Sequence, residues 1–189
     1  MEEKKTEIEV INQPYDTDLP VLENMDAYID YLLPEVKAWS EDLYETEHYE
    51  GGAPWLEFRD DENFNWVVLH FFNPDNEYLR SIDGNVYTGT WRILESNKII
   101  LDYPKSGTQV KELYDLAFMN SEFFILKKHG NQSGKKKYFV MAREPFAKKM
   151  DWRELMEQLH YKNRFSYIYV IGIILVVLIV VGAILFSSK

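Results

Sequence analysis

The chain has 189 residues, enough for one domain with a substantial core, and carries a formal net charge of −10. Cysteine is absent, which excludes disulfide bonds, thiolate zinc sites and cysteine nucleophiles together. Apolar residues make up 46% of the chain and aromatic residues 15%, which indicates folded structure, and the acidic balance argues against a nucleic-acid partner.

The acidic residues are concentrated at the start of the chain. Residues 1–62 contain 19 Asp and Glu against four Lys and Arg, whereas the remainder contains 12 acidic and 17 basic residues. This acidic front is either a solvated surface or a docking surface for a basic protein partner, and the sequence leaves both interpretations open.

A flexible acidic arm is predicted over residues 1–17, followed by a helical region over 18–54. Asp18 before a Leu-Pro pair indicates a helix start, and Pro34 predicts a break or kink before the apolar period resumes. Two short helices, or one kinked helix, are expected here. The residues on the first apolar stripe are Leu22, Met25, Ile29, Leu32 and Leu33.

Residues 55–145 are predicted to form a β-domain, because short aromatic and β-branched runs alternate with turn residues every eight to twelve positions. The Asp83-Gly84 pair is the clearest hairpin signal. Consecutive strands without intervening helices predict an antiparallel meander, open or closed into a barrel. The predicted strands are 55–59, 65–72, 77–82, 86–94, 98–103, 110–119, 122–128 and 136–143.

Alternation along the fourth predicted strand places Tyr87, Gly89 and Trp91 on the core face, and Gly89 is expected to permit a bend or a close approach. Trp66, Tyr87 and Trp91 are the aromatic residues expected to line a barrel interior, and therefore the candidate ligand-binding residues. An eight-stranded barrel is either filled by its own side chains or leaves room for one small ligand. The many bulky residues favour a filled interior.

The stretch Gly89-Thr90-Trp91, followed by Asn97-Lys98-Ile99-Ile100-Leu101, resembles the small lipocalin-like domains of many bacterial proteins. Two later runs are similar to the tyrosine-centred strand and hydrophobic hairpin of that family: Leu113-Tyr114-Asp115-Leu116 and Phe123-Phe124-Ile125-Leu126. The resemblance covers roughly residues 55–143. It implies a calycin-type barrel, whose functions in that family range from ligand carriage to scaffolding.

After the β-domain, residues 146–165 predict an amphipathic juxtamembrane helix. Asp151 and Glu154 are spaced as a capping box, and an apolar stripe follows at helical spacing. The stripe either lies in the headgroups of a membrane or covers one end of the barrel, and the sequence does not decide between them. Its residues are Trp152, Leu155, Met156 and Leu159.

Residues 166–189 predict a C-terminal transmembrane anchor. From Tyr167 to Phe186 there are 20 residues without a charge, 15 of them Ile, Leu, Val or Phe, which is the length needed to cross about 30 Å of hydrocarbon. Basic residues precede this run and only Lys189 follows it, so the positive-inside rule places the N-terminal domain in the cytoplasm, in keeping with a bacterial inner membrane. The expected membrane-interface residues are Lys148, Lys149, Trp152, Arg153, Arg164, Tyr167 and Tyr169.

No motif specifies a reaction, a cofactor or a metal site. The four histidines do not stand at metal-ligand spacing, and His70, within an aromatic strand, fits a satisfied core or rim histidine better than a catalyst. Five lysines surround one predicted hairpin tip, as a soluble loop or as a contact for anionic lipid or an acidic partner. They are Lys127, Lys128, Lys135, Lys136 and Lys137.

Together these features predict a mainly β (α+β) protein with N-terminal helices, a lipocalin-like barrel, a juxtamembrane helix and one membrane anchor. The predicted function is non-enzymatic: a membrane-anchored cytoplasmic interaction or scaffold module, an accessory subunit of a membrane-associated complex. Its partners would be the bilayer and a protein bound through the acidic helical region or the anchor. The alternative is a membrane-tethered carrier or sensor of a small, lipid-like apolar ligand held in the barrel.

Overall fold

The computed structural model describes residues 19–130 and 136–187, and within the last helix it describes the side chains of residues 152–162 and 171–181. The predicted arm, residues 1–17, and the predicted helix start at Asp18 lie outside the described residues. The same holds for Lys135 in the lysine-rich hairpin and for the side chains of Arg164, Tyr167 and Tyr169.

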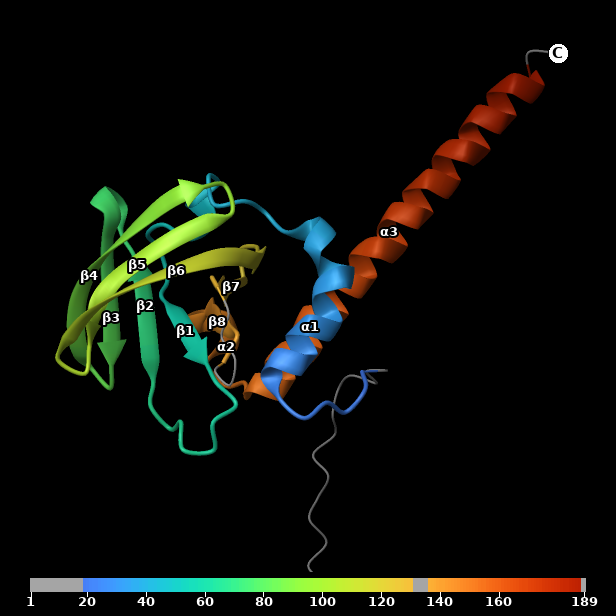
Figure 1. Ribbon diagram of the computed structural model, residues 1–189. Coiled ribbons are helices and arrows are strands. Elements are labelled where there is room, and N and C mark those ends of the chain that lie inside the picture. The colour runs from blue at the N-terminus through green and yellow to red at the C-terminus, as the bar shows by residue number, and fades with distance from the viewer. Residues whose placement is uncertain (1–18, 131–135, 188–189) are drawn as a thin grey trace, which may run out of the picture.

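Eight antiparallel strands form a closed barrel in which each strand pairs with its neighbours along the chain and β8 returns to pair with β1 (Figure 1). This up-and-down arrangement confirms the predicted mainly β fold. The predicted strand bounds differ from the observed ones by at most three residues at either end. The strands are β1 (Trp55–Phe58), β2 (Val68–Phe72), β3 (Glu77–Ile82), β4 (Asn85–Glu95), β5 (Lys98–Lys105), β6 (Thr108–Met119), β7 (Phe123–Lys128) and β8 (Tyr138–Arg143).

Two-residue turns with left-handed backbone conformations fix the register of two hairpins. Asp83 and Gly84 connect β3 to β4 with φ angles of 45° and 86°, as the Asp-Gly signal predicts. Ser106 and Gly107 connect β5 to β6 in the same way, with φ angles of 50° and 79°. Such turns match the right-handed twist of the strands they join.

The backbones of β4 and β5 approach each other closely at Gly89. A Cβ atom added at Gly89 would lie 2.8 Å from the Cβ of Tyr103 and would also clash with the carbonyl oxygen of Asp102. This confirms the prediction that Gly89 permits a close approach in a strongly curved sheet.

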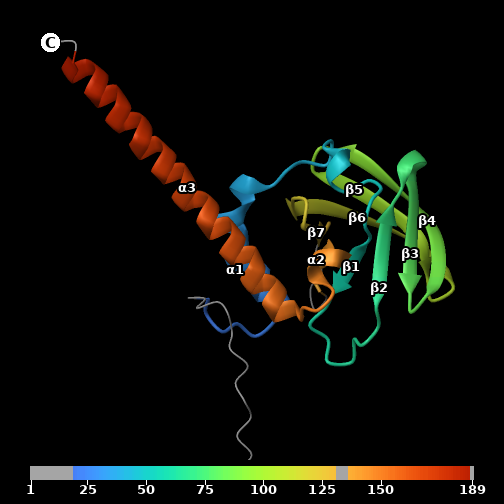
Figure 2. The same ribbon diagram turned by 180° about the vertical axis from the view of Figure 1, so that it is seen from behind.

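Apolar side chains are buried on both sides of the barrel wall. One cluster fills the interior and includes Trp55 and Phe124. A second lies outside the wall, where Phe58, Phe123 and Val140 pack with residues of the helices, which gather on one side of the barrel (Figures 1 and 2). Strand β7 therefore contributes residues to both clusters, which explains its four consecutive buried residues. The helices are α1 (Met25–Val36), α2 (Glu144–Ala147) and α3 (Trp152–Ser187).

Helix α1 begins at Met25 and not near residue 18, because Asn24 caps it: the Asn24 side-chain oxygen accepts a hydrogen bond from the N–H of Ala27 at 2.9 Å. The predicted break at Pro34 is wrong. Pro34 lies in the last turn of α1, and the helix continues to Val36. Apolar residues on either side of Pro34 pack in the second cluster, outside the barrel wall.

Acidic side chains of α1 dock this helix on the last hairpin of the barrel. The Asp26 carboxylate accepts hydrogen bonds from the backbone N–H groups of Lys137 and Tyr138, at 2.8 and 3.3 Å. The Asp30 carboxylate accepts from the Tyr138 hydroxyl at 2.7 Å and pairs with the Lys137 ammonium group. Part of the acidic front and part of the lysine-rich hairpin thus neutralise each other within the chain.

Helix α3 begins with the predicted capping box: the Asp151 side chain accepts from the N–H of Glu154, and the Glu154 side chain accepts from the N–H of Asp151, both at 2.8 Å. Its first turns cover the barrel wall and α1, with the Trp152 ring edge-on to Tyr28 at 5.7 Å and Leu155 fully buried. Of the two placements that the sequence left open for this stripe, the structure shows the one against the barrel. Residues 146–165 are not a separate element, because α3 runs on through residue 165.

Within the described part of the chain, no helix has a stretch long and apolar enough to cross a membrane.

Candidate functional site: the mouth of the barrel

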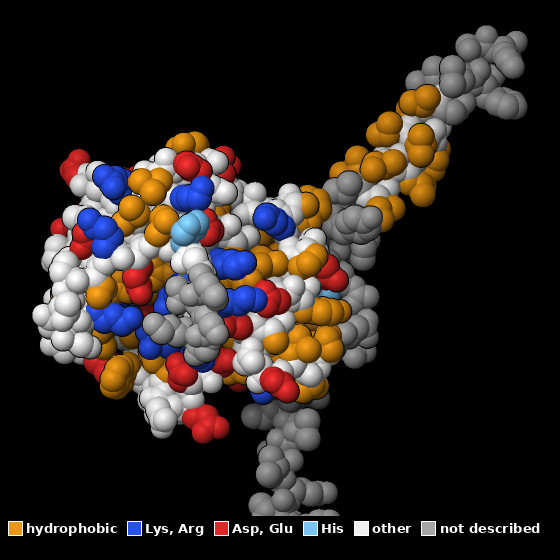
Figure 3. Space-filling model, viewed as in Figure 1, with side chains coloured by type: hydrophobic (Ala, Val, Ile, Leu, Met, Phe, Trp, Pro, Cys, Tyr) orange, Lys and Arg blue, Asp and Glu red, His pale blue; other side chains and the backbone are white. Residues whose placement is uncertain are grey.

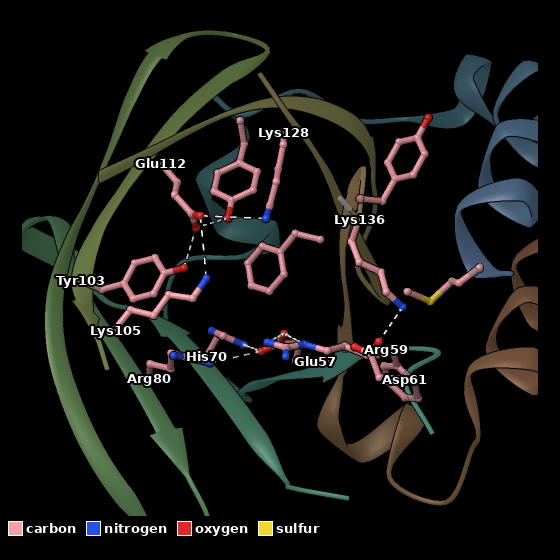
Figure 4. A pocket seen from close by; sticks show the side chains of 15 residues that line it. Glu57, Arg59, Asp61, His70, Arg80, Tyr103, Lys105, Glu112, Lys128 and Lys136 are labelled. Carbon is pink, nitrogen blue, oxygen red and sulfur yellow. Dashed lines mark hydrogen bonds and ion pairs between the residues drawn. The ribbon is translucent and has the colours of Figure 1, made fainter. Parts of the chain in front are cut away.

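A pocket of about 170 Å³ opens at one end of the barrel, beside Met25 at the start of α1 (Figure 4). We refer to this pocket as the barrel mouth. Titratable side chains from strands on opposite sides of the barrel point into it. The lining residues labelled in Figure 4 are Glu57, Arg59, Asp61, His70, Arg80, Tyr103, Lys105, Glu112, Lys128 and Lys136.

The other end of the barrel is filled by the segment that follows α1. Leu43 and Tyr49 from this segment have no exposed surface, and the Tyr49 hydroxyl donates to the carbonyl oxygen of Leu43 at 2.7 Å. The Tyr49 ring lies against Trp91 and Phe124, with centroids 5.6 and 5.3 Å apart. Aromatic side chains therefore occupy the interior beneath the mouth, as the predicted filled barrel requires.

One wall of the mouth is organised around Glu57, whose side chain is only 3% exposed. Its Oε1 accepts from Arg59 at 2.5 Å, its Oε2 accepts from His70 Nε2 at 3.0 Å, and the Arg80 guanidinium lies 3.9 Å from Oε2. Burial alone would raise the pKa of the Glu57 carboxyl, but the hydrogen bond from His70 and the nearby arginines lower this pKa to about 2. Glu57 is therefore an anion at neutral pH.

His70 links Glu57 to a buried tyrosine. A carboxylate can only accept, so His70 Nε2 carries the hydrogen, and His70 Nδ1 accepts from the Tyr78 hydroxyl at 2.5 Å. Burial lowers the pKa of His70, which keeps the ring neutral, and burial raises the pKa of the Tyr78 hydroxyl well above its usual value. This confirms the prediction of a satisfied, buried histidine. It also means that the chain of three groups ends in a hydroxyl without solvent access.

The opposite wall is organised around Glu112. Its Oε2 accepts hydrogen bonds from the hydroxyls of Tyr103 and Tyr114, both at 2.6 Å. Its Oε1 faces the ammonium groups of Lys105 and Lys128, each 4.0 Å away. Burial would raise the pKa of Glu112, but the two tyrosine hydroxyls and the lysines lower it, so Glu112 is also an anion.

Three cations in the mouth have only distant partners. Among the described residues Arg80 makes no side-chain hydrogen bond, although its side chain is only 11% exposed. It has the 3.9 Å ion pair with Glu57, and its guanidinium lies 5.6 Å from the centre of the Tyr103 ring. Lys105 and Lys128 have ion pairs with Glu112 at 4.0 Å. Their N–H donors are therefore available to an acceptor that enters the pocket.

The lining of the mouth is basic in a protein that is strongly acidic overall. Five basic and three acidic side chains line it, a formal charge of +2, against −10 for the whole chain. The volume of about 170 Å³ is below the ~300–1,000 Å³ of pockets for drug-sized ligands. The mouth therefore suits a small anion or the charged end of a larger molecule.

No family model, curated protein or solved structure matches this chain. The assignment of the site therefore rests on its own geometry.

The structure separates the three aromatic residues that we expected to line the interior. Trp91 is 4% exposed and packs inside the barrel, with its Nε1 donating to the carbonyl oxygen of Asn73 at 3.0 Å. Trp66 precedes β2 in a loop and is 59% exposed, so its predicted interior position is wrong. Tyr87 is 41% exposed, beside Arg80 on the paired strand, and does not pack in the interior either. Alternation along β4 does place Tyr87 on the same face as Trp91. However, β4 extends past the filled part of the barrel, and Tyr87 lies in that extension.

The lysine-rich hairpin contributes to the mouth and to the docking of α1. Lys128 and Lys136 line the mouth, Lys136 pairs with Asp60 and Asp61, and Lys137 pairs with Asp30. Of the expected membrane-interface residues, Trp152 is packed against α1, whereas Lys148, Lys149 and Arg153 are exposed.

A second group of polar side chains lies on the segment after α1. Glu41, Glu45 and His48 are close enough together to share a cation. However, both ring nitrogens of His48 already face carboxylates, at 3.0 Å for Glu41 and 3.5 Å for Glu45. This arrangement is that of a histidine between two carboxylates, in which Glu41 Oε2 is buried and makes no hydrogen bond to the described residues.

Proposed function

We propose that this chain is a non-enzymatic interaction module, anchored to a membrane by α3, whose barrel mouth binds an anionic group of its partner. The observation that carries the proposal is the lack of a close partner for Arg80, whose nearest carboxylate oxygen is 3.9 Å away. The Arg80 side chain is only 11% exposed and makes no hydrogen bond to the described residues, and its guanidinium lines the pocket, so its N–H donors are open to an acceptor from outside. Lys105 and Lys128, across the mouth, provide further donors for the same anion.

The charge arrangement supports selectivity for an anion and not for a cation. The carboxylate in each wall of the mouth faces two cations: Arg59 and Arg80 lie beside Glu57, and two lysines lie beside Glu112. The carboxylates hold the cations in place without neutralising them fully. An incoming anion therefore meets donors that are already oriented, which lowers the entropic cost of binding.

Two of the alternatives have less support. An enzymatic role would need a reactive group with access to substrate, whereas the Tyr78 hydroxyl at the end of the histidine chain is buried. A lipid-like ligand would need apolar space, whereas the interior beneath the mouth is occupied by aromatic rings.

Anion binding is tested by titrating the full-length protein in mild detergent with succinate and with inorganic phosphate, at constant ionic strength. We expect saturable binding that Arg80→Gln weakens by about tenfold or more, since a hydrogen bond to a charged group contributes ~1.5–3 kcal/mol. Arg92→Gln is the matched control, because Arg92 is exposed on the neighbouring strand. Isothermal titration calorimetry gives the dissociation constants.

Equal weakening by Arg92→Gln, or no saturable binding by either anion, would contradict the proposal. Circular dichroism of both variants establishes that the barrel is intact.

The anchor is proposed from the sequence run 167–186 together with the exposure of the described part of α3. All residues from Ile171 to Val181 are exposed, and the larger apolar ones among them are 48–66% exposed. Figure 3 shows this end of the helix covered with hydrophobic side chains, while Lys and Arg gather over the barrel. Such a surface is unfavourable in water and suits a lipid environment.

Extraction of native membranes with alkaline carbonate tests the anchor. We expect the full-length chain to remain in the pellet, and the double variant Leu175→Arg and Leu178→Arg to be released, because each central arginine disfavours insertion by ~2.5–3.5 kcal/mol. Leu175→Ala with Leu178→Ala is the control that keeps the segment apolar. Release of the unaltered chain into the supernatant would overturn this part of the proposal.

A further inference from the structure

Large apolar side chains lie exposed around the rim of the mouth, on the side of Arg59 and Arg80. We refer to Trp66, Val67 and Tyr87 as the apolar rim; they are 59%, 56% and 41% exposed. Tyr87 on β4 is the cross-strand neighbour of Arg80 on β3.

The loop that carries Trp66 is fixed to the β3–β4 turn. The N–H of Val67 donates to the Asp83 side chain, and the N–H of Asp83 donates to the carbonyl oxygen of Val67, both at 3.1 Å. In the same loop the Phe64 ring lies 4.5 Å from the Arg59 guanidinium. The rim and the arginines are thus held as neighbours by contacts among the described residues.

We propose that the mouth and the apolar rim together bind an extended acidic peptide segment of a partner protein, which places a carboxylate between Arg80 and the lysines and an apolar side chain on the rim. This inference rests on the proposed anion binding and specifies its ligand. A carboxylate suits the planar guanidinium, which can bind it with two parallel hydrogen bonds. A free inorganic anion would leave the rim uncovered, whereas a peptide covers it.

The closed barrel restricts how such a peptide can bind. Each of the described strands is paired on both sides, so within the part of the chain that the structure describes a peptide finds no free sheet edge to extend. Recognition must then come from side chains that enter the mouth. This places the specificity in one acidic position and the neighbouring apolar position of the peptide.

The position of the rim favours a peptide over a lipid headgroup. The β1–β2 loop and the β3–β4 turn lie at the end of the barrel opposite to the direction in which α3 extends (Figures 1 and 2). With α3 in a membrane, the mouth faces away from the bilayer and toward the aqueous phase. A peptide in solution can reach it there.

The test is fluorescence anisotropy of the full-length protein in nanodiscs with three labelled octapeptides. The first has two adjacent glutamates beside leucine and tryptophan, the second has glutamines in place of the glutamates, and the third has alanines in place of the leucine and tryptophan. We expect the first to bind at least tenfold more tightly than either of the others. Trp66→Ser with Val67→Ser should remove the advantage over the third peptide and leave succinate binding unchanged.

Arg80→Gln should weaken both the first peptide and succinate, while Val21→Ser, at an 88% exposed site on the side of the helices, should change neither. The peptide proposal is overturned if the three peptides bind alike, or if the double rim variant has no effect, even where succinate binds. Failure of succinate to bind in an Arg80-dependent manner would instead reject the proposed anion site itself.

Discussion

Glu57→Gln is expected to lower the free energy of unfolding by about 3 kcal/mol. Removing one member of a buried ion pair costs ~3–5 kcal/mol because the remaining charge is left without compensation. Here Arg80 is the charge left behind, since its side chain is only 11% exposed. The expected loss lies at the lower end because Arg59, 36% exposed, can turn toward water. Urea denaturation in mild detergent, followed by far-ultraviolet circular dichroism, measures the effect.

The pH dependence of this variant provides a second measurement. The pKa of Glu57 is lowered from 4.5 to about 2 in the folded protein, so its contribution to stability is complete above pH 4.5 and is lost as the pH falls toward 2. The difference in stability between the unaltered chain and Glu57→Gln should therefore shrink over this interval. Glu95→Gln, at a 62% exposed site, is the control and should show no such difference. A constant difference from pH 7 to pH 2 would contradict the assigned role of Glu57.

Trp91→Ala is expected to destabilise the barrel by ~3–5 kcal/mol, the usual cost of truncating a buried aromatic side chain to alanine. The Trp91 ring packs against Tyr49 and Phe72 at 5.6 and 6.1 Å between centroids, and its N–H donates to Asn73. The mutation leaves a cavity in the filled end of the barrel and removes the hydrogen bond to the Asn73 carbonyl.

Trp66→Ala is the matched control, because it removes the same side chain from a 59% exposed position. Its effect on the free energy of unfolding should be within ~0.5 kcal/mol. Equal destabilisation by the two substitutions would mean that Trp66 is packed as tightly as Trp91, which the structure excludes. The comparison is made by urea denaturation as above.

The fold was largely predictable because its signals are local. Two-residue alternation and turn residues located all eight strands, and Gly89 was recognised as a position of close approach. Closure of the barrel was not predictable, because the pairing of β1 with β8 joins residues far apart in the sequence. The start of α1 was missed because Asn24 competes with Asp18 as a cap, and Pro34 was misjudged because burial of the surrounding stripe offsets one missing hydrogen bond.

The mouth was not predicted, although a signal for part of it was present. Glu57 and Glu112 stand at inward positions of alternating strands, where a charged residue among apolar ones indicates a buried ionic group. Their cations come from other strands: Arg80 from β3, Lys105 from β5 and Lys128 from β7. No spacing in the sequence reveals that these residues meet, because the barrel brings them together only when it closes. Of the expected aromatic residues, only Trp91 was placed correctly.

The contacts that complete this fold join the first elements of the chain to the last ones. Strand β1 needs β8 for its second partner, and α1 needs the backbone of Lys137 and Tyr138 together with the first turns of α3. During synthesis, the apolar stripe of α1 emerges long before the residues that cover it. Folding therefore cannot proceed to completion from the N-terminus as the chain is made. Until residue 143 is available the nascent sheet has an open edge at β1, and until residue 159 is available the stripe of α1 lacks part of its cover.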